Sequence, residues 1–455
     1  MRTLRLLLLL CLVPALAGAV DEAEFARRRR ALMEQIPDGI VLLRSSSAMT
    51  WEASSFRQDP AFYYFTGLAN AHQAILAIDG GAKETWLFAG PAPESTLFVP
   101  DLRGLESIFV APGAESEHAL GLEHVVPWDE LTGVVGSRRT QDGKVALYVD
   151  SGGFASALSL GGNTPKGVPP VEPSWAVWRK VVHDLWPDAE IKDATPILDS
   201  VRAVKSPAEI ALLKNAADVT LPAFWSAVAA IRTGRRQRAV EAAVVSACVE
   251  AGAEGPSFWP WIRSGPSAGP ASLFEALADY HNLDRAMMGG ELVRVDLGCE
   301  LRLYKADYGR TIPVSGRFDE GQREVLELLV GAYRAGVAQM RPGANQAGVF
   351  RATAACVIER RGRLKTPLAR EAAATVDERT AFFLHGIGLD LIEASPPVFR
   401  AGNVICYEPR LTARDQSFFV EDTFLITASG AERISPELPY TAEGLEKEIA
   451  RRRRK

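Results

Sequence analysis

Two aspartates, Asp296 and Asp307, each lie inside an apolar run with the composition of a β-strand. The alternating pattern predicts strands over Leu292–Leu297 and Tyr304–Val314, joined by a turn at Gly298–Glu300. A buried carboxylate is unfavourable by several kcal/mol unless a cation or a set of hydrogen-bond donors meets it. A hairpin would also place two like charges side by side. A divalent metal ion between them satisfies both conditions, whereas the alternative is an Asp296 that caps the turn and an Asp307 in solvent.

Three further candidate ligands, His385, Glu408 and Glu421, lie in later apolar segments. Taken singly, each fits an ordinary role as a hydrogen-bonded core histidine or a solvated glutamate. With the two aspartates they make four carboxylates and one imidazole, a set that suits Mn²⁺, Co²⁺, Fe²⁺ or Zn²⁺. Four negative charges call for more than one divalent ion, and two ions about 3.5–4 Å apart are a known hydrolytic arrangement. The strands are expected within Phe382–Leu391, Asn403–Leu411 and Phe418–Thr427.

The start of the chain, Met1–Ala19, has the features of a secretory signal. Arg2 and Arg5 give a positively charged end, Leu6–Leu16 a short apolar core, and Ala17–Ala19 a small-residue cleavage site. The apolar run is shorter than the ~18 residues that span a bilayer, and no later segment reaches that length. We therefore expect an exported protein, secreted or periplasmic, with no membrane segment once the signal is removed.

The length and composition are those of a two-domain globular protein, with 455 residues of which 47% are hydrophobic. The net charge of −5 is modest, and the basic runs at the chain ends contain no aromatic residues, which argues against a nucleic-acid partner. Strand-like and helix-like segments alternate up to Pro187–Thr195, which predicts an α/β domain. From Ser200 onward the pattern favours an α+β core. The four later cysteines form no CxxC pair, and a disulfide between them stays open.

The order and spacing of these residues resemble a known enzyme family. The chain from Ser200 to about Ser435 is similar to the catalytic domain of the pita-bread metallopeptidases: methionine aminopeptidase, aminopeptidase P and prolidase. The segment Phe56–Gly67 resembles the N-terminal domain of aminopeptidase P and prolidase. With the signal peptide at 1–19, this implies an α/β creatinase/aminopeptidase P-like domain over 20–190 and an α+β pita-bread catalytic domain over 197–445. The matching stretches are Val201–Ile210, Val295–Gly298, Asp307–Thr311, His385–Leu389, Glu408–Pro409 and Glu421–Asp422.

The resemblance also implies roles for the five candidate ligands. Asp296 would chelate one metal ion, and Asp307 would bridge two. His385 and Glu408 would bind the second ion, with Glu421 as the other bridge. Two divalent ions are implied, Mn²⁺ first and Co²⁺, Zn²⁺ or Fe²⁺ as alternatives, and a metal-bound hydroxide would attack the peptide carbonyl. Glu408 would relay the proton to the leaving amine, and the family also implies a homodimer.

The chain departs from the aminopeptidase P and prolidase pattern around this centre. Those enzymes usually carry histidines where this chain has Ala381 and Ile392, and many have an arginine at the place of Phe419. His281 lies in the interval where a further catalytic histidine is expected, and it is our candidate for that role. The predicted substrate pocket consists of Phe258, Ile392 and Phe419.

These departures leave the metal ligands in place and change the pocket. Loss of carbonyl-polarising donors of this kind lowers a rate by about 100-fold or more, so a strict requirement for proline is questionable. The leading prediction is an exported dinuclear aminopeptidase of the Xaa-Pro peptidase type that acts on short peptides. One alternative is a non-peptidase metalloenzyme that uses the same scaffold on a small molecule. Another is a metal-binding protein with weak turnover or none.

Overall fold

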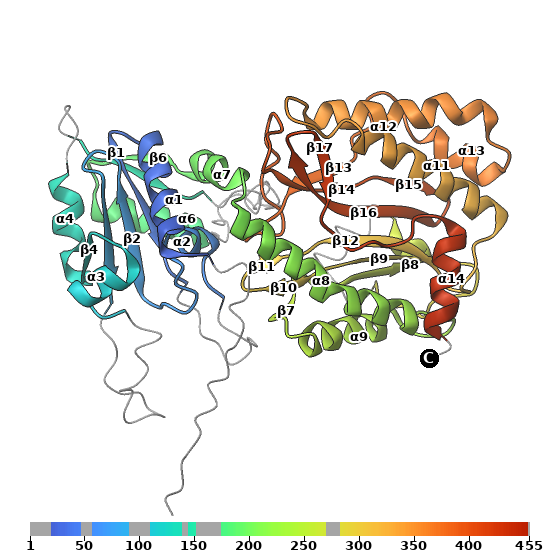
Figure 1. The fold of residues 1–455 in the computed structure, drawn as a ribbon, viewed down its shortest axis with the longest axis horizontal. Helices are drawn as coiled ribbons and strands as arrows, with labels where there is room; N and C mark the ends of the chain where they lie inside the picture. Colours follow the sequence, from blue (N-terminus) through green and yellow to red (C-terminus); the bar gives the residue numbers. More distant parts are fainter. Residues whose placement is uncertain are drawn as a thin grey trace, which may run out of the picture.

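The computed structural model describes residues 20–46, 57–90, 110–138, 144–151, 174–269 and 283–453. These residues form two units, each built around its own β-sheet, which lie side by side along the long axis of the molecule (Figure 1). The expected signal peptide at 1–19 and the candidate His281 lie outside the described residues. Among the helices that are described, none is both long enough and apolar enough to cross a membrane.

The first unit contains a six-stranded mixed sheet in the order β4-β3-β2-β1-β5-β6. Strands β1, β2 and β3 are antiparallel neighbours, whereas β4, β5 and β6 each run parallel to the strand beside them. The strands are β1 (Gly39–Arg44), β2 (Ala74–Asp79), β3 (Glu84–Ala89), β4 (His124–Pro127), β5 (Ala146–Val149) and β6 (Glu190–Asp193).

Helices cover both faces of this sheet, so its central strands are apolar without interruption. On β1, Val41 and Leu43 pack beneath α1 (Glu22–Gln35) and α2 (Pro60–Thr66). Ile40 and Leu42 pack on the other face, in the cluster that holds the side chains of α4 (Leu131–Ser137) and α6 (Ser174–Leu185). The remaining helices are α3 (Ala114–Leu120), η1 (Trp128–Glu130) and α7 (Thr195–Ala203), the last of which leads into the second unit.

The second unit contains an eight-stranded sheet whose main path runs β13-β14-β16-β12-β9-β8, with β15 and β17 paired to β16. A three-stranded sheet, β11-β10-β7, lies beside it. All of these pairings are antiparallel. The strands are β7 (Gly255–Pro256), β8 (Trp261–Ser264), β9 (Leu292–Leu297), β10 (Cys299–Leu301), β11 (Tyr304–Lys305), β12 (Tyr308–Pro313), β13 (Phe383–Gly386), β14 (Val404–Glu408), β15 (Arg410–Ala413), β16 (Gln416–Thr427) and β17 (Gly430–Arg433).

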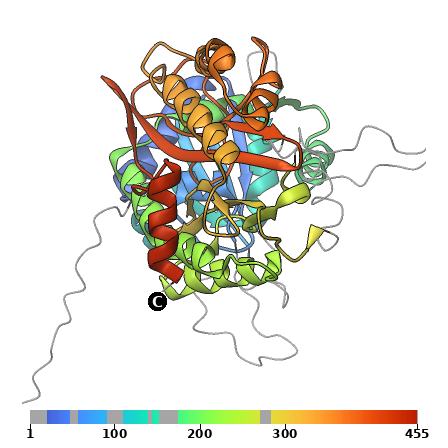
Figure 2. The same ribbon diagram turned by 90° about the vertical axis from the view of Figure 1, so that its right-hand side faces the viewer.

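Two groups of helices flank this sheet (Figure 1). The pair α8 (Pro207–Ala230) and α9 (Gln237–Glu250) lies along β8 and β9, and α11, α12 and α13 lie on the side of β14 to β16. The helix α14 lies at the end of the second unit that is remote from the first unit (Figures 1 and 2). The other helices are η2 (Gly265–Ala268), α11 (Glu320–Val337), α12 (Gln346–Arg360), η4 (Arg361–Arg363), α13 (Pro367–Ala374) and α14 (Ala442–Arg453). The fold thus confirms the predicted combination of an α/β unit and an α+β unit.

The hairpin that carries the two aspartates turns later than the sequence pattern suggested. Strands β9 and β12 pair as expected, with Asp296 opposite Gly309. The residues between them add the small hairpin β10–β11, which turns at Arg302 and Leu303, both with positive φ values of 52° and 67°. The expected turn at Gly298–Glu300 is therefore wrong. Gly298 is instead a point of close approach, since a Cβ there would lie 1.6 Å from the carbonyl oxygen of Ala306.

Buried contacts join the two units. The guanidinium of Arg28 on α1 lies 3.2 Å from the carboxylate of Glu209 on α8, and both side chains are almost fully buried. Ser206, which caps α8, donates a 2.7 Å hydrogen bond to Glu24 of α1. The hydroxyl of Tyr64 on α2 donates to the carbonyl of Val201 on α7 at 2.9 Å. Because these contacts come from separate helices, they fix the orientation of the first unit against the second.

A disulfide joins Cys248 at the end of α9 to Cys299 on β10. The two cysteines are 51 residues apart in the sequence, their Cα atoms are 5.7 Å apart, and both side chains are fully buried. This resolves the question that the cysteine spacing left open. Cys356 and Cys406 are free thiols.

Candidate metal centre

The candidate ligands share one face of the second sheet because strand side chains alternate between two faces. On β9, Val295 packs into the core beneath the helices, and Asp296 points to the opposite face. On β14, Tyr407 packs into that same core, and Glu408 points away from it. Glu421 of β16 lies on the face of Asp296 and Glu408. Alternation alone therefore brings carboxylates from three strands together.

A glycine separates two of these carboxylates. Strand β12 lies between β9 and β16, and its Gly309 pairs with Asp296 on one side and with Glu421 on the other. A Cβ at this position would lie 2.3 Å from the carbonyl oxygen of Val295 and 2.4 Å from a ring carbon of Phe419. Glycine is required because the space above the strand is already filled.

Asp307 precedes β12 and faces His385 on β13, with its Oδ2 atom 3.7 Å from Nε2 of the imidazole. Nδ1 of His385 lies 2.9 Å from the carbonyl oxygen of Gly386. A carbonyl can only accept, so Nδ1 carries the proton and Nε2 presents its lone pair to Asp307, the state that a metal ligand needs. Burial lowers the pKa of His385 to about 4. Thr423 holds the aspartate in place by donating a 2.7 Å hydrogen bond to its backbone carbonyl.

Two neighbouring carboxylates on β16 differ in whether their oxygens have hydrogen-bond partners. Asp422 points to the helix-covered face and accepts hydrogen bonds of 2.6–3.1 Å from Arg310, Tyr333 and Ser435. Glu421 is fully buried, and neither of its carboxylate oxygens has a hydrogen-bond partner among the described residues. Oδ1 of Asp307 is also buried and has no hydrogen-bond partner among the described residues. Burial raises the pKa of both Glu421 and Asp307 well above the usual values, and neighbouring carboxylates add to the shift.

These unsatisfied oxygens fit a bound divalent cation. Ligand atoms of Asp307, His385, Cys406 and Glu421 all lie within 4.8 Å of one another, and so do those of Asp296, Glu408 and Glu421. Buried carboxylates without partners are unfavourable unless a cation compensates them. The donor set, mostly oxygen with one imidazole, suits first-row divalent metals. The five predicted ligands thus converge on one buried cluster, in two groups that share Glu421.

Two members of this cluster were not anticipated from the sequence. Arg294 lies two residues before Asp296 on β9, and its Nη2 atom is 2.7 Å from Oδ2 of Asp296 and 2.7 Å from Oε2 of Glu408. Cys406 lies two residues before Glu408 on β14 and opposite His385. Side chains two residues apart on a strand lie on the same face, so this spacing from a predicted ligand could have identified both residues from the sequence. Burial raises the pKa of Glu408 to about 7, and Arg294 opposes that shift.

The predicted substrate-pocket residues have different environments. Phe258 and Ile392 are partly exposed, and Ile392 lies in the loop that follows β13. Phe419 is fully buried, and the guanidinium of Arg294 lies 4.1 Å from its ring centroid. Phe419 stands where many members of the family have an arginine, and in this chain Arg294 of β9 lies over that position. A role of these three residues in substrate binding stays a prediction, as does that of His281.

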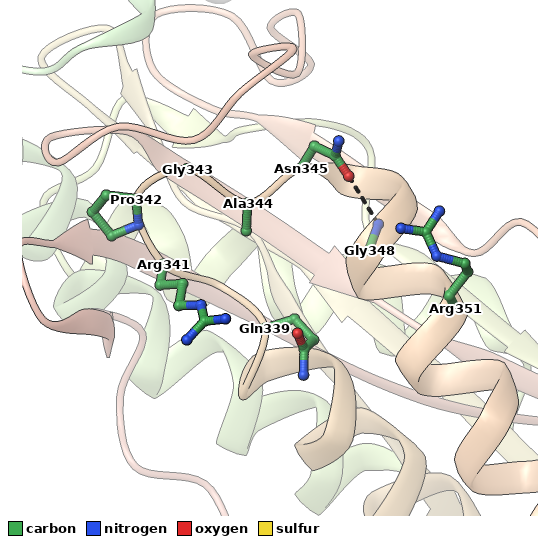
Figure 3. Close-up of a pocket in the computed structure, with 8 residues that line it drawn as sticks. All are labelled: Gln339, Arg341, Pro342, Gly343, Ala344, Asn345, Gly348 and Arg351. Carbon is green, nitrogen blue, oxygen red and sulfur yellow. Dashed lines mark hydrogen bonds between the residues drawn. The ribbon is translucent and has the colours of Figure 1, made fainter.

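A separate surface cavity of about 580 Å³ lies at the connection between α11 and α12 (Figure 3). Asn345 caps α12 there by accepting a 2.9 Å hydrogen bond from the backbone of Gly348. None of its lining residues belongs to the carboxylate cluster, and its two arginines are exposed, so the cavity adds nothing to the metal centre. It is lined by Gln339, Arg341, Pro342, Gly343, Ala344, Asn345, Gly348 and Arg351.

Comparison with known proteins agrees with this architecture. Residues 211–428 match the model of metallopeptidase family M24, and residues 25–146 match the model of the aminopeptidase P N-terminal domain. The chain is 30% identical over 385 residues to an Aspergillus fumigatus protein named Probable Xaa-Pro aminopeptidase, covering 82% of this chain and 75% of that protein. It is 25% identical to the Escherichia coli Xaa-Pro aminopeptidase over 461 residues, covering 94% and 97% of the two chains.

Solved structures show the same fold. The structure of Pseudomonas aeruginosa aminopeptidase PepP superposes with a TM-score of 0.71 at 24% identity, covering 96% of this chain and all of that one. A His361Ala form of Escherichia coli aminopeptidase P gives the same TM-score at 23% identity. The fold and the buried carboxylate cluster define a metallopeptidase of family M24. Within that family the chain belongs to the aminopeptidase P type.

Proposed function

We propose that the protein is an exported aminopeptidase that removes the N-terminal residue of short peptides with the help of two divalent ions, Mn²⁺ in the first instance. The observation that carries the proposal is the buried cluster whose Glu421 and Asp307 oxygens have no hydrogen-bond partners among the described residues. Following the two ligand groups of the structure, and not the assignment implied by the family resemblance, Asp307, His385 and Glu421 would hold one ion. Asp296, Glu408 and Glu421 would hold the other. When bound, such ions supply an activated water molecule and polarise the scissile carbonyl.

The chain's own groups perform the remaining steps. The carboxylates of the cluster offer acceptor oxygens to the free amino end of a peptide, which fits a preference for the first residue. Glu408, which lies at the end of β14 beside Arg294, would take a proton from the attacking water and pass it to the leaving amine. The hydrogen bond between His385 and Gly386 keeps Nε2 available as a ligand.

We propose further that proline in the second position of the peptide is not required. Relatives with this architecture bear the name Xaa-Pro aminopeptidase. In this chain, the positions at which the family usually carries pocket histidines are Ala381 and Ile392, which have no donor side chain. Without these donors, the pocket loses groups that orient a scissile carbonyl, so proline and non-proline peptides become similar substrates.

Export is proposed from the signal-like start of the chain and is supported by the Cys248–Cys299 disulfide. Stable disulfides are typical of secreted and periplasmic proteins and rare in the reducing cytosol. Closing a loop of this length stabilises a folded chain by about 4 kcal/mol in the chain-entropy model. Fractionation of the producing cell, with thiol labelling of Cys248, tests the location. A homodimer, implied by family likeness, is tested by light scattering of the purified protein.

The decisive experiment compares metal content and peptide cleavage in the purified protein from residue 20 onward. Removal of metal with a chelator should abolish release of the first residue, and Mn²⁺ or Co²⁺ should restore it. Asp307→Ala should lose both bound metal and activity, whereas Glu371→Ala, an exposed carboxylate paired with Arg414, should lose neither. The peptide panel should contain matched pairs with proline or alanine in the second position.

Each outcome separates the alternatives. Similar rates for the proline and alanine peptides support the proposed specificity, and a large preference for proline overturns it. A protein that carries bound metal but cleaves no peptide of the panel excludes aminopeptidase activity. It leaves a reaction on a small molecule or a metal-binding role as the alternatives. A protein without metal under all conditions excludes the metal centre itself.

A further inference from the structure

Arg294 places a positive charge inside the carboxylate cluster. Its side chain is only about one-tenth exposed, and one atom, Nη2, lies 2.7 Å from both Oδ2 of Asp296 and Oε2 of Glu408. Hydrogen bonds between ionised partners are roughly twice as strong as neutral ones. The guanidinium thus occupies the space between two carboxylates that also belong to one of the candidate ligand groups.

Aromatic rings hold this guanidinium in position. Its Cζ atom is 4.1 Å from the ring centroid of Phe419 and 6.0 Å from that of Trp261. Phe419 is fully buried, so the face beneath Arg294 is dry. A desolvated cation–π contact of this kind is stronger than one at an exposed surface. The arginine is therefore a fixed part of the cluster.

The two ligand groups consequently differ in charge. In the group of Asp307, His385 and Glu421, no arginine or lysine forms an ion pair within the described part of the chain, and three carboxylate oxygens lack hydrogen bonds. In the group of Asp296 and Glu408, Arg294 already pairs with both carboxylates. With all four carboxylates ionised, the single charge of Arg294 and the double charge of one divalent ion leave the cluster with a net charge of −1. A second ion beside an unmoved Arg294 would give +1.

We propose that Arg294 is a built-in cation that competes with a divalent ion for Asp296 and Glu408. The chain then binds one ion tightly at Asp307, His385 and Glu421, and a second ion binds weakly because it must displace the guanidinium from two hydrogen bonds. This inference rests on the proposed metal centre and adds an order of occupancy to it. The resting protein holds one ion and Arg294, and the second ion enters only at high concentration.

The test is a calorimetric titration of the metal-free full mature chain with Mn²⁺, together with Mn²⁺ content after dialysis. The wild-type protein should show one tight and one weak site, at least about tenfold apart in Kd. Arg294→Met keeps an apolar side chain over Phe419 and should tighten the weak site by tenfold or more. Arg294→Lys keeps the charge and should resemble the wild type. Arg285→Met, which breaks a bidentate pair with Glu291 outside the cluster, is the matched control and should change neither site.

Electron paramagnetic resonance gives a readout that does not depend on activity. One equivalent of Mn²⁺ should give the six-line signal of an isolated ion in both proteins. At two equivalents, Arg294→Met should show the signal of two coupled ions, whereas the wild type should still show that of an isolated ion. Two sites of equal affinity in the wild type overturn the inference even if no variant folds, and so does an Arg294→Met titration that matches the wild type. A protein that binds both ions at high Mn²⁺ with unequal affinity but cleaves no peptide overturns the proposed function and leaves the competition intact.

Discussion

Gly309 is the residue on which the geometry of the cluster depends most directly. It lies between Asp296 and Glu421, and a Cβ there would meet the carbonyl oxygen of Val295 at 2.3 Å and the ring of Phe419 at 2.4 Å. Gly309→Ala should therefore separate the strands, lower the free energy of unfolding by about 1–3 kcal/mol and reduce retained Mn²⁺. Urea unfolding and metal content measure the two effects.

The matched control for this substitution is Gly133→Ala on α4. A Cβ at Gly133 would meet nothing within 4 Å. Alanine is the better helix former by about 1 kcal/mol, so this variant should be as stable as the wild type or more stable. If Gly309→Ala behaved like the control, the close packing described around β12 would be incorrect.

Much of the centre could be predicted at this scale, and the omissions have a physical cause. Asp296, Asp307, His385, Glu408 and Glu421 are chemically distinctive within apolar runs, so composition alone marks them as candidates. An arginine next to apolar residues is not distinctive, because its long side chain usually reaches solvent. Which way it points depends on a neighbouring strand that is more than a hundred residues away in the sequence. The direction of this side chain is therefore decided by how the strands pair in the sheet and not by the local sequence.

At the scale of elements, the loop after β13 is held by a buried carboxylate that belongs to no ligand group. Glu393 accepts a 2.6 Å hydrogen bond from Lys205 and one of 2.7 Å from Arg202, both near the connection between the units. Its backbone pairs with Gly386, the residue after His385. Burial alone would raise the pKa of Glu393, but Lys205 and Arg202 outweigh it and lower the pKa to about 2.

The depressed pKa of Glu393 has a defined consequence for acid stability. The ordinary pKa of a glutamate is near 4.5, so the stabilisation is complete above that pH and is lost as the pH falls toward 2. The difference corresponds to roughly 3 kcal/mol. Glu393→Gln should be less stable than the wild type by about this amount at pH 7 and should show a flatter decline between pH 5 and 2.

Urea unfolding at a series of pH values measures that slope. Glu437→Gln, whose side chain is 94% exposed beside Arg433, serves as the control and should follow the wild-type curve. Parallel curves for Glu393→Gln and the wild type would show that the ion pairs with Lys205 and Arg202 do not stabilise the fold.

Strand identity was easier to predict than strand boundaries. The runs around Asp296, Glu408 and Glu421 are strands as expected, because apolar alternation depends only on local sequence. The run expected to extend to Leu391 ends at Gly386, since Glu393 folds back to pair with it. The turn of the aspartate hairpin was also misplaced, because left-handed Arg302 and Leu303 are unusual turn residues. Such features depend on contacts beyond the segment itself.

At the scale of the whole molecule, the ion pair between Arg28 and Glu209 is the best test of how the two units are coupled. The guanidinium also donates a 3.0 Å hydrogen bond to the carbonyl of Tyr64 and lies 4.1 Å from the centroid of its ring. Arg28→Met leaves Glu209 buried with its opposite charge removed. Breaking one partner of a buried pair costs about 3–5 kcal/mol, and the loss should fall on the contact between the units.

Differential scanning calorimetry of the metal-free chain should then resolve two transitions for Arg28→Met where the wild type shows one. The double variant Arg28→Met with Glu209→Gln should recover part of the loss, because the charge of Glu209 is removed and only Glu24, the other carboxylate that pairs with Arg28, keeps its charge there. Arg323→Met breaks a partly exposed pair with Glu446 inside the second unit and should cost less than about 1 kcal/mol. A single unshifted transition in Arg28→Met would mean that this ion pair does not couple the units. The remaining contacts would then suffice, since the fold places Leu198, Leu213 and Tyr304 in the same buried cluster as Leu32 and Phe65.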